Sequence, residues 1–355
     1  MKKKDIYGDF YSPLRVMSYN RPYVFVTGSR SQGKSVGFGI YIIRKAIQEK
    51  KKFIYIRRTD SELKETAPTF MKDPVFIINR YYGDIIQSWN YEHNTYFINE
   101  EVVGYSMPLN AADKWKSKNL SDVFYLFYDE FLCRDSTKYL GSKNNPYVET
   151  QLIESIFQTC DRGIDRPYRN EVTLIGCANT STLYNPLFVS LGIDKYLAND
   201  VKARFVAPKN KLWVVENSLA KDVKALQDYK NSNVYLLSGE QTRDYAFESN
   251  GVDDKTFICK NVGKLNPLFN VVYNGLKMGV YIDQFDMKMY ICRKPYKEGN
   301  TFALTTNDHS PSYKLMQMNF PQMSLIKQFY LAGNLKFSDG SCRFAIETYM
   351  KFDRY

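Results

Sequence analysis

Residues 28–35, Gly-Ser-Arg-Ser-Gln-Gly-Lys-Ser, have the residue types and spacing of a phosphate-binding loop, G-x-x-x-x-G-K-S/T. Glycines let the backbone turn tightly and direct successive N–H groups at a phosphate, and a following helix N-terminus adds partial positive charge. Lys34 is expected to reach the β- and γ-phosphates of ATP, and the Ser35 hydroxyl to bind Mg²⁺. We therefore predict an ATP and Mg²⁺ site that includes Gly28, Gly33, Lys34 and Ser35.

The flanking residues agree with this prediction. The apolar run Tyr23–Thr27 is typical of a buried strand, and residues 36–48 carry apolar residues at helical spacing. Strand, loop and helix follow in the order that a phosphate-binding loop requires. The alternative, a glycine turn that binds nothing, would not need these flanks.

A second apolar run, Val123–Tyr128, is followed at once by Asp129 and Glu130. Asp129 is predicted to hold Mg²⁺, directly or through water, and Glu130 to orient and polarise the water that attacks the γ-phosphate. An acidic pair after a strand is more often a solvated turn. Together with the glycine-rich loop, however, it indicates hydrolysis, and the adjacent glutamate favours hydrolysis over phosphoryl transfer to a substrate.

Composition excludes several classes of protein. The chain has 355 residues, enough for about two domains, and a hydrophobic content of 44% allows a large core. Only two histidines are present and no cysteine pair has C-x-x-C spacing, so a zinc site is not expected. Neither a signal peptide nor a membrane span is predicted. The net charge of +11 favours a polyanionic partner.

The first 200 or so residues alternate apolar strands with helical patterns. Further strands are predicted at Phe53–Arg57 and Val172–Ala178. This alternation indicates an α/β fold with a parallel sheet covered by helices, and with ligands at the carboxyl ends of the strands. We assign residues 1–215 to this domain and residues 216–250 to a linker or lid.

The pattern changes in residues 251–355, which we assign to a smaller α+β domain. Two strands that meet at Asn274-Gly275 predict a hairpin, formed by Phe269–Tyr273 and Leu276–Ile282. Strand-like runs at 287–292 and 301–306 follow, and then helical patterns at 323–331 and 342–352.

Several of these motifs together resemble the DNA-packaging ATPases of phi29-like tailed phages. The shared features run along most of the chain and are weakest between about 195 and 255. They comprise Arg30 within the loop, the approach to the loop at 18–28, the strand at 53–58, the acidic motif 129–131, Asn179 with Asn185-Pro186, and the segments 272–275 and 305–306.

The resemblance implies a homopentameric ring that hydrolyses ATP with Mg²⁺ and drives double-stranded DNA into a procapsid. Such a ring would act in the host-cell cytoplasm, transiently at the portal vertex, with the portal (connector) as its partner. Whether a packaging RNA joins the ring stays open. The implied fold is a P-loop ATPase core of the additional-strand, catalytic-glutamate class, followed by a vestigial RNase H-like nuclease domain.

The position of Asn179, at the end of a strand expected beside the acidic strand, predicts a sensor of the γ-phosphate; an asparagine that only caps a turn is the alternative. Arg30 is predicted to contact the γ-phosphate or to pair with Glu130. Tyr19 and Arg21 precede the first core strand and are predicted to pack on adenine.

A ring motor also needs an arginine that acts on the neighbouring subunit's nucleotide. The resemblance places it directly after Phe157, but Gln158 stands there. We prefer Arg162, with Arg166 and Arg169 as alternatives.

Three lysines at alternate positions precede the acidic strand, where they would line a pore and touch DNA phosphates. A solvated loop is the alternative. Lys116 matches a pore lysine of the family and is our first choice. The predicted DNA-binding residues are Lys114, Lys116 and Lys118.

The C-terminal domain decides between a motor and a motor with a nuclease. A two-metal nuclease needs several converging acidic groups, but Phe269–Tyr273 carries none, and Asp283 and Asp286 come later. A nuclease fold used only for binding is therefore preferred. A terminase with an active nuclease, another nucleic-acid-dependent ring NTPase and a nucleotide-bound structural protein of the virion remain as alternatives.

Overall fold

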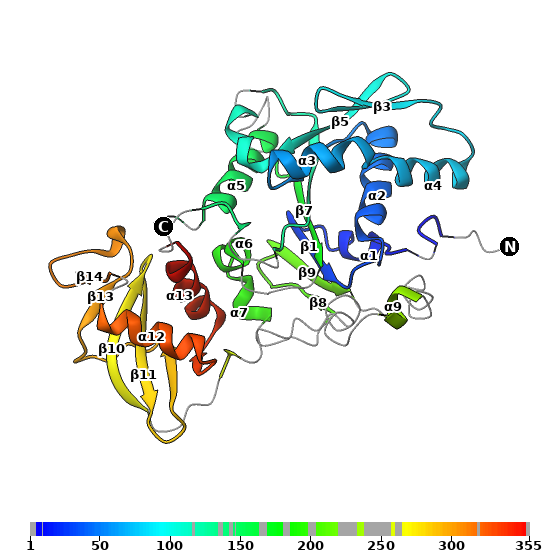
Figure 1. Cartoon of the computed structure of the whole chain (residues 1–355). Coiled ribbons are helices and arrows are strands. Elements are labelled where there is room, and N and C mark those ends of the chain that lie inside the picture. The colour runs from blue at the N-terminus through cyan, green and yellow to red at the C-terminus, as the bar shows by residue number, and fades with distance from the viewer. Residues whose placement is uncertain are drawn as a thin grey trace. The chain divides into compact units, whose positions relative to one another are not determined.

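The computed structural model describes residues 5–8, 10–115, 118–133, 138–141, 145, 147–162, 169–179, 185–197, 204–218, 233–237, 257–259, 265–317 and 320–352. The chain forms two compact units (Figure 1). The first comprises Met1–Cys133, Thr150–Ser181 and Lys202–Asn250, and the second comprises Arg134–Glu149, Thr182–Val201 and Gly251–Tyr355.

The first unit contains a mixed sheet whose six central strands run parallel. The α/β class and the parallel sheet predicted from the sequence are therefore confirmed. In spatial order the strands are β3 (Trp89–Glu92), β4 (Thr95–Ile98), β5 (Glu101–Pro108), β2 (Lys52–Arg57), β6 (Val123–Asp129), β7 (Thr173–Asn179), β1 (Tyr23–Gly28), β9 (Trp213–Ser218) and β8 (Phe205–Val206).

The sheet ends in antiparallel strands on both sides, which the sequence analysis did not predict. Strands β3 and β4 form a tight hairpin in which His93 and Asn94 have φ of 49° and 62°. Two positive φ values at the centre of a two-residue turn match the right-handed twist of the strands. Strand β9 continues the sheet to Ser218, so the boundary expected after residue 215 falls inside this strand.

Helices cover both faces of this sheet. Val24 and Val26 of β1 belong to one buried cluster with Phe38 of α2 (Lys34–Glu49), whereas Tyr23 stacks on Phe157 of α5 (Val148–Asp161) with ring centroids 5.2 Å apart. Burial of each such side chain stabilises the fold by about 1.5–3 kcal/mol. Among the described residues, the other helices of this unit are α1 (Leu14–Met17), α3 (Asp60–Thr66), η1 (Ala67–Thr69), α4 (Lys72–Tyr82), η2 (Leu109–Trp115) and α9 (Asn233–Leu237).

The second unit is an α+β domain built on a six-stranded sheet. The predicted hairpin is present, and Asn274 and Gly275 at its turn have φ of 45° and 77°. In spatial order the strands are β14 (Lys314–Leu315), β13 (Thr301–Ala303), β10 (Asn266–Tyr273), β11 (Leu276–Asp283), β12 (Lys288–Cys292) and β15 (Leu335–Phe337).

Helices α12 (Pro321–Leu331) and α13 (Gly340–Phe352) pack on this sheet, close to the predicted bounds. The segment that holds α6 (Pro186–Ser190) and α7 (Ile193–Leu197) also joins this unit, although the sequence analysis assigned it to the first domain. The Ser341 hydroxyl donates to the buried Asp194 carboxylate at 2.7 Å and ties α13 to α7. The unit also contains a short helix, η5 (Thr306–Asp308).

No helix within the described part of the chain is both long and apolar enough to span a bilayer.

Candidate nucleotide site

The glycine-rich loop, residues 28–35, connects β1 to α2 in the first unit. Its two glycines are required by their surroundings. A Cβ on Gly33, whose φ is 73°, would lie 2.5 Å from Cδ1 of Phe10, and a Cβ on Gly28 would lie 2.8 Å from the Ser218 carbonyl oxygen. Larger residues would push the loop away from its neighbours.

A pocket of about 160 Å³ opens over this loop at the carboxyl ends of β1, β6 and β7. Whole small-molecule sites enclose about 300–1,000 Å³, so this pocket fits a part of a nucleotide such as its phosphates. The lining residues are Arg30, Ser31, Gln32, Gly33, Lys34, Ser35, Val36, Asp129, Glu130, Cys177, Ala178 and Asn179.

The ammonium group of Lys34 lies over the loop. Its Nζ donates to the carbonyl oxygens of Gly28 at 3.2 Å and Ser29 at 2.6 Å, and to Oδ1 of Asn179 at 3.5 Å. Burial lowers the pKa of Lys34. A buried ammonium group held by neutral oxygens would gain strongly from an anionic phosphate.

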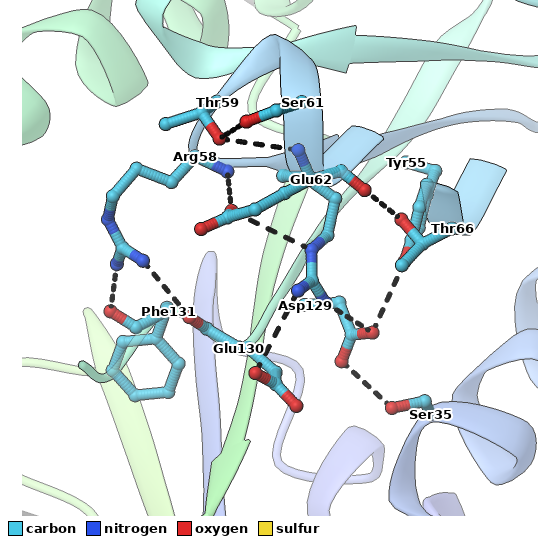
Figure 2. Close-up of polar contacts among 11 residues, drawn as sticks. Ser35, Tyr55, Arg58, Thr59, Ser61, Glu62, Thr66, Asp129, Glu130 and Phe131 are labelled. Carbon is cyan, nitrogen blue, oxygen red and sulfur yellow. Dashed lines mark hydrogen bonds and ion pairs between the residues drawn. The ribbon is translucent and has the colours of Figure 1, made fainter. Parts of the chain in front are cut away.

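The Ser35 hydroxyl donates to Asp129 Oδ1 at 2.8 Å, as Figure 2 shows. Burial raises the pKa of Asp129, although Arg57 opposes this shift. A hydroxyl and a carboxylate on one side of this pocket are the hard oxygen ligands that Mg²⁺ takes together with phosphate oxygens and waters. The residues therefore fit a magnesium ion.

Two arginines at the end of β2 hold the acidic turn, and the sequence analysis missed both. Arg57 Nη1 lies 3.2 Å from Asp129 Oδ2, and its Nη2 lies 3.8 Å from Glu130 Oε2. Arg58 donates to the carbonyl oxygens of Phe131 at 2.7 Å and Glu130 at 3.5 Å (Figure 2). Because β2 pairs with β6 in parallel, the carboxyl ends of the two strands lie side by side. The sequence feature that could have revealed these residues is the pair of adjacent arginines at the end of the strand next to the acidic strand.

Glu130 has a left-handed backbone, with φ of 53°, and a side chain that is 58% exposed. Its carboxylate therefore reaches solvent at the pocket, where an attacking water would enter. Arg30 also lines the pocket and is exposed, so it lies within reach of the space where a terminal phosphate would bind.

Neither residue predicted to contact adenine lines the pocket. The Tyr19 ring stacks on Phe205 of β8 with centroids 5.6 Å apart, and Arg21 is half-buried. Their assignment to the adenine stays a prediction.

The candidate arginines differ in their surroundings. Arg162 is exposed directly after α5, whereas Arg166 lies outside the described residues. Arg169 Nη2 donates to the Val123 carbonyl oxygen at 2.8 Å, and its guanidinium lies 4.4 Å from the Phe124 ring centroid. Arg169 thus already braces the start of β6.

Of the three predicted DNA-binding lysines, the structure describes two. Lys114 is exposed at the end of η2, and Lys118 Nζ lies 3.7 Å from the centroid of a Trp115 ring. Lys116 lies outside the described residues.

Comparison with known proteins gives a consistent result along the whole chain. The family model described as podovirus DNA encapsidation protein (Gp16) matches residues 4–353. The DNA packaging protein of Bacillus phage B103 is 27% identical, over 91% of this chain and 95% of the relative. The DNA packaging protein of Bacillus phage phi29 is 25% identical, over 93% of each chain.

The fold also matches a solved structure of the bacteriophage Phi-29 genome packaging motor assembly. The TM-score is 0.70, with 24% sequence identity over 97% of this chain and 99% of the other. A second match, the Phi-28 gp11 DNA packaging motor, has a TM-score of 0.64 and 17% identity over 98% of each chain.

Proposed function

The chain belongs to the podovirus DNA encapsidation protein (Gp16) family, and on this basis we propose that it is an ATP hydrolase that drives double-stranded DNA into a phage procapsid. One observation carries the ATPase assignment. One pocket is lined by residues from the start of α2 and from the carboxyl ends of β6 and β7: Lys34, Ser35, Asp129, Glu130 and Asn179. Each has the residue type and place that phosphate binding and hydrolysis require.

The geometry supports the following role for each residue. Loop N–H groups and Lys34 bind the phosphates, and Lys34 exchanges its contacts with the loop carbonyl oxygens for phosphate oxygens. Ser35 and Asp129 would hold Mg²⁺, which would neutralise charge on the terminal phosphates. Glu130 accepts a proton from the attacking water, and Asn179 contacts the terminal phosphate or that water. Arg57, which lies between both carboxylates, positions Glu130.

The fold supports the finer class that the family implies. Strand β7 lies between β1, which carries the glycine-rich loop, and β6, which carries the acidic pair. This inserted strand and the glutamate at 130 favour the additional-strand, catalytic-glutamate class of P-loop ATPases.

We further propose that the second unit is an RNase H-like domain without nuclease activity. Strand β10 carries no acidic residue. Asp283 accepts hydrogen bonds from the backbone N–H groups of Phe285 and Asp286 in its own turn, and Asp286 pairs with Lys288. These carboxylates therefore stabilise a hairpin instead of converging on a metal.

A ring explains the place of Arg162. Helix α5 runs back along the sheet and ends at Asp161, which accepts hydrogen bonds from the backbone of Asn170 and Glu171 just before β7 begins. Arg162 therefore lies at the amino edge of the sheet, opposite its own pocket. From there it would act on the nucleotide of a neighbouring subunit, in a homopentamer bound at the portal.

Phosphate contacts from lysines suit a motor that moves along any sequence, because they position a protein without reading bases. Lys114 and Lys118 are exposed, and the chain carries an excess charge of +11. We assign these lysines and Lys116 to the DNA surface of the ring pore.

The experiment that tests this function uses purified protein, procapsids, DNA and Mg·ATP. Packaged DNA becomes resistant to added nuclease, and the Lys34→Ala variant is the matched control for ATP dependence. We expect ATP- and procapsid-dependent protection. DNA-stimulated hydrolysis without protection would instead indicate another nucleic-acid-dependent NTPase, and Mn²⁺-dependent nicking by the protein would indicate an active terminase nuclease.

A further inference from the structure

The proposed ATP site leaves the nucleoside without a binding surface, and the following inference rests on that function. The pocket holds only the phosphate end. Asp129, Glu130 and Asn179 lie at the ends of β6 and β7, and both strands lie on one side of β1. A nucleotide whose terminal phosphate is held there extends along the loop toward the other side of β1, where β9 lies.

On that side of the loop lies the N-terminal segment that contains Phe10 and Tyr11. The Gln32 side chain donates to the Ser218 carbonyl oxygen of β9 at 3.2 Å, and the Tyr11 backbone N–H donates to the Gln32 carbonyl oxygen at 2.9 Å. The Phe10 ring contacts the α-carbon side of Gly33, yet the residue is 41% exposed. An apolar residue that packs against the loop thus stays partly exposed to solvent.

The segment is held rigidly in this place. The Tyr11 phenol donates to the buried Glu216 carboxylate at 2.5 Å, and Arg204 donates to the other oxygen of that carboxylate at 3.0 and 3.1 Å. The Tyr11 carbonyl oxygen lies so close to α2 that a Cβ on Gly37 would be only 2.2 Å from it. Tyr11 is therefore fixed to both β9 and α2, and it holds the adjacent Phe10 in register with Gly33.

We propose that Phe10 is the stacking platform for the nucleobase of the bound nucleotide. A flat aromatic surface binds a base through its π-face, and one such contact is typically worth tenfold or more in affinity. Tyr19, the candidate from the sequence, already stacks on Phe205 and packs against the core. Phe10 offers its exposed surface beside the loop.

The test separates base binding from phosphate binding by using two ligands on the full-length protein. Calorimetry measures the affinity of Mg·ATP and of Mg·tripolyphosphate, which has no base. The main variant is Phe10→Leu, because leucine keeps an apolar contact with Gly33 but lacks a π-face. Phe10→Tyr restores that face, and Phe76→Leu changes a 64%-exposed phenylalanine of α4 that does not line the pocket.

We expect Phe10→Leu to weaken Mg·ATP about tenfold and to leave Mg·tripolyphosphate unchanged. Phe10→Tyr and Phe76→Leu should match the wild type with both ligands. If the leucine variant does not fold, Phe10→Met, which also fills the space beside Gly33, takes its place.

Three results would overturn the inference. Equal weakening of both ligands would show that Phe10 only shapes the glycine-rich loop, and no change in either would show that the base lies elsewhere. Selective loss of Mg·ATP affinity in Tyr19→Leu, with Phe10→Leu silent, would place the base on Tyr19. A wild-type protein that binds neither ligand would instead refute the proposed ATP site itself.

Discussion

Glu130 is expected to reduce stability and to be essential for turnover, and these two effects can be measured separately. Its φ of 53° places a non-glycine residue in the left-handed region. That conformation costs about 1–2 kcal/mol for a residue with a Cβ. Glycine escapes this cost but loses about 0.5–1 kcal/mol more backbone entropy on folding. The free energy of unfolding of Glu130→Gly should therefore exceed that of Glu130→Ala by roughly 0.5–1 kcal/mol.

Alanine is the right reference because both variants lose the same side-chain contacts, including the one with Arg57 at 3.8 Å. Denaturant unfolding at fixed protein concentration gives the difference directly. In a thermal scan, 1 kcal/mol corresponds to about 2–4 °C for a unit of this size. Steady-state hydrolysis should fall about 100-fold or more in both variants, and also in Glu130→Gln. Mg·ATP binding should persist, since Lys34, Ser35 and Asp129 are unchanged.

Two results would refute this reasoning. If Glu130→Gly were no more stable than Glu130→Ala, the acidic turn would not hold residue 130 in the left-handed conformation. If Glu130→Gln kept nearly wild-type turnover, another group would activate the water, and the acidic turn would serve only to bind the metal.

Three further predictions concern the ring, the DNA and the buried carboxylate behind the loop. Mixing Arg162→Ala with Lys34→Ala subunits should restore part of the lost hydrolysis, because some interfaces pair an intact arginine with an intact loop; inactive mixed rings would argue against Arg162. Burial raises the pKa of Glu216, so its contribution to stability is fully present below about pH 4.5 and is lost as pH rises through the folded-state pKa. Unfolding measured from pH 4.5 upward should therefore show a steeper loss of stability in the wild type than in Glu216→Gln, and parallel curves would contradict this sign. Replacing Lys114, Lys116 and Lys118 together by alanine should weaken DNA binding equally on unrelated sequences and uncouple ATP hydrolysis from packaging. The salt dependence of DNA binding should fall by about one counterion for each lost phosphate contact. An unchanged salt dependence with normal packaging would show that these lysines only form a solvated loop.

Much of the fold could be predicted because local sequence patterns indicate its strands and turns. The apolar runs that became β1, β2, β6 and β7 are short and continuous, as strands buried on both faces must be. The hairpin turn at Asn274-Gly275 could also be predicted from local sequence, because few other residue pairs readily adopt a positive φ at both turn positions. The hairpin of β3 and β4 was missed because its half-exposed strands carry a weaker pattern and its turn, His93-Asn94, lacks a glycine.

Domain membership was harder to predict than secondary structure. The segment with α6 and α7 follows β7 directly, so adjacency in sequence assigned it to the first domain. Its buried Asp194, however, accepts a hydrogen bond from Ser341, almost 150 residues further along the chain. Such long-range pairing leaves no local signal, and only the folded chain shows it.

The amino-acid sequence was enough to predict a chemistry for the candidate site, because the loop motif, the acidic pair and the strand-end asparagine are each recognised by residue type and spacing. Only the folded structure shows which distant side chains contact these site residues. Arg57 lies 72 residues before Asp129 in the chain, yet β2 pairs with β6 and brings its guanidinium within 3.2 Å of that carboxylate. Phe10 likewise lies against Gly33 next to Tyr11, whose phenol is bound to Glu216, more than 200 residues away. Spacing along the chain specifies which groups can react, whereas the pairing of distant strands specifies which charges and surfaces surround them.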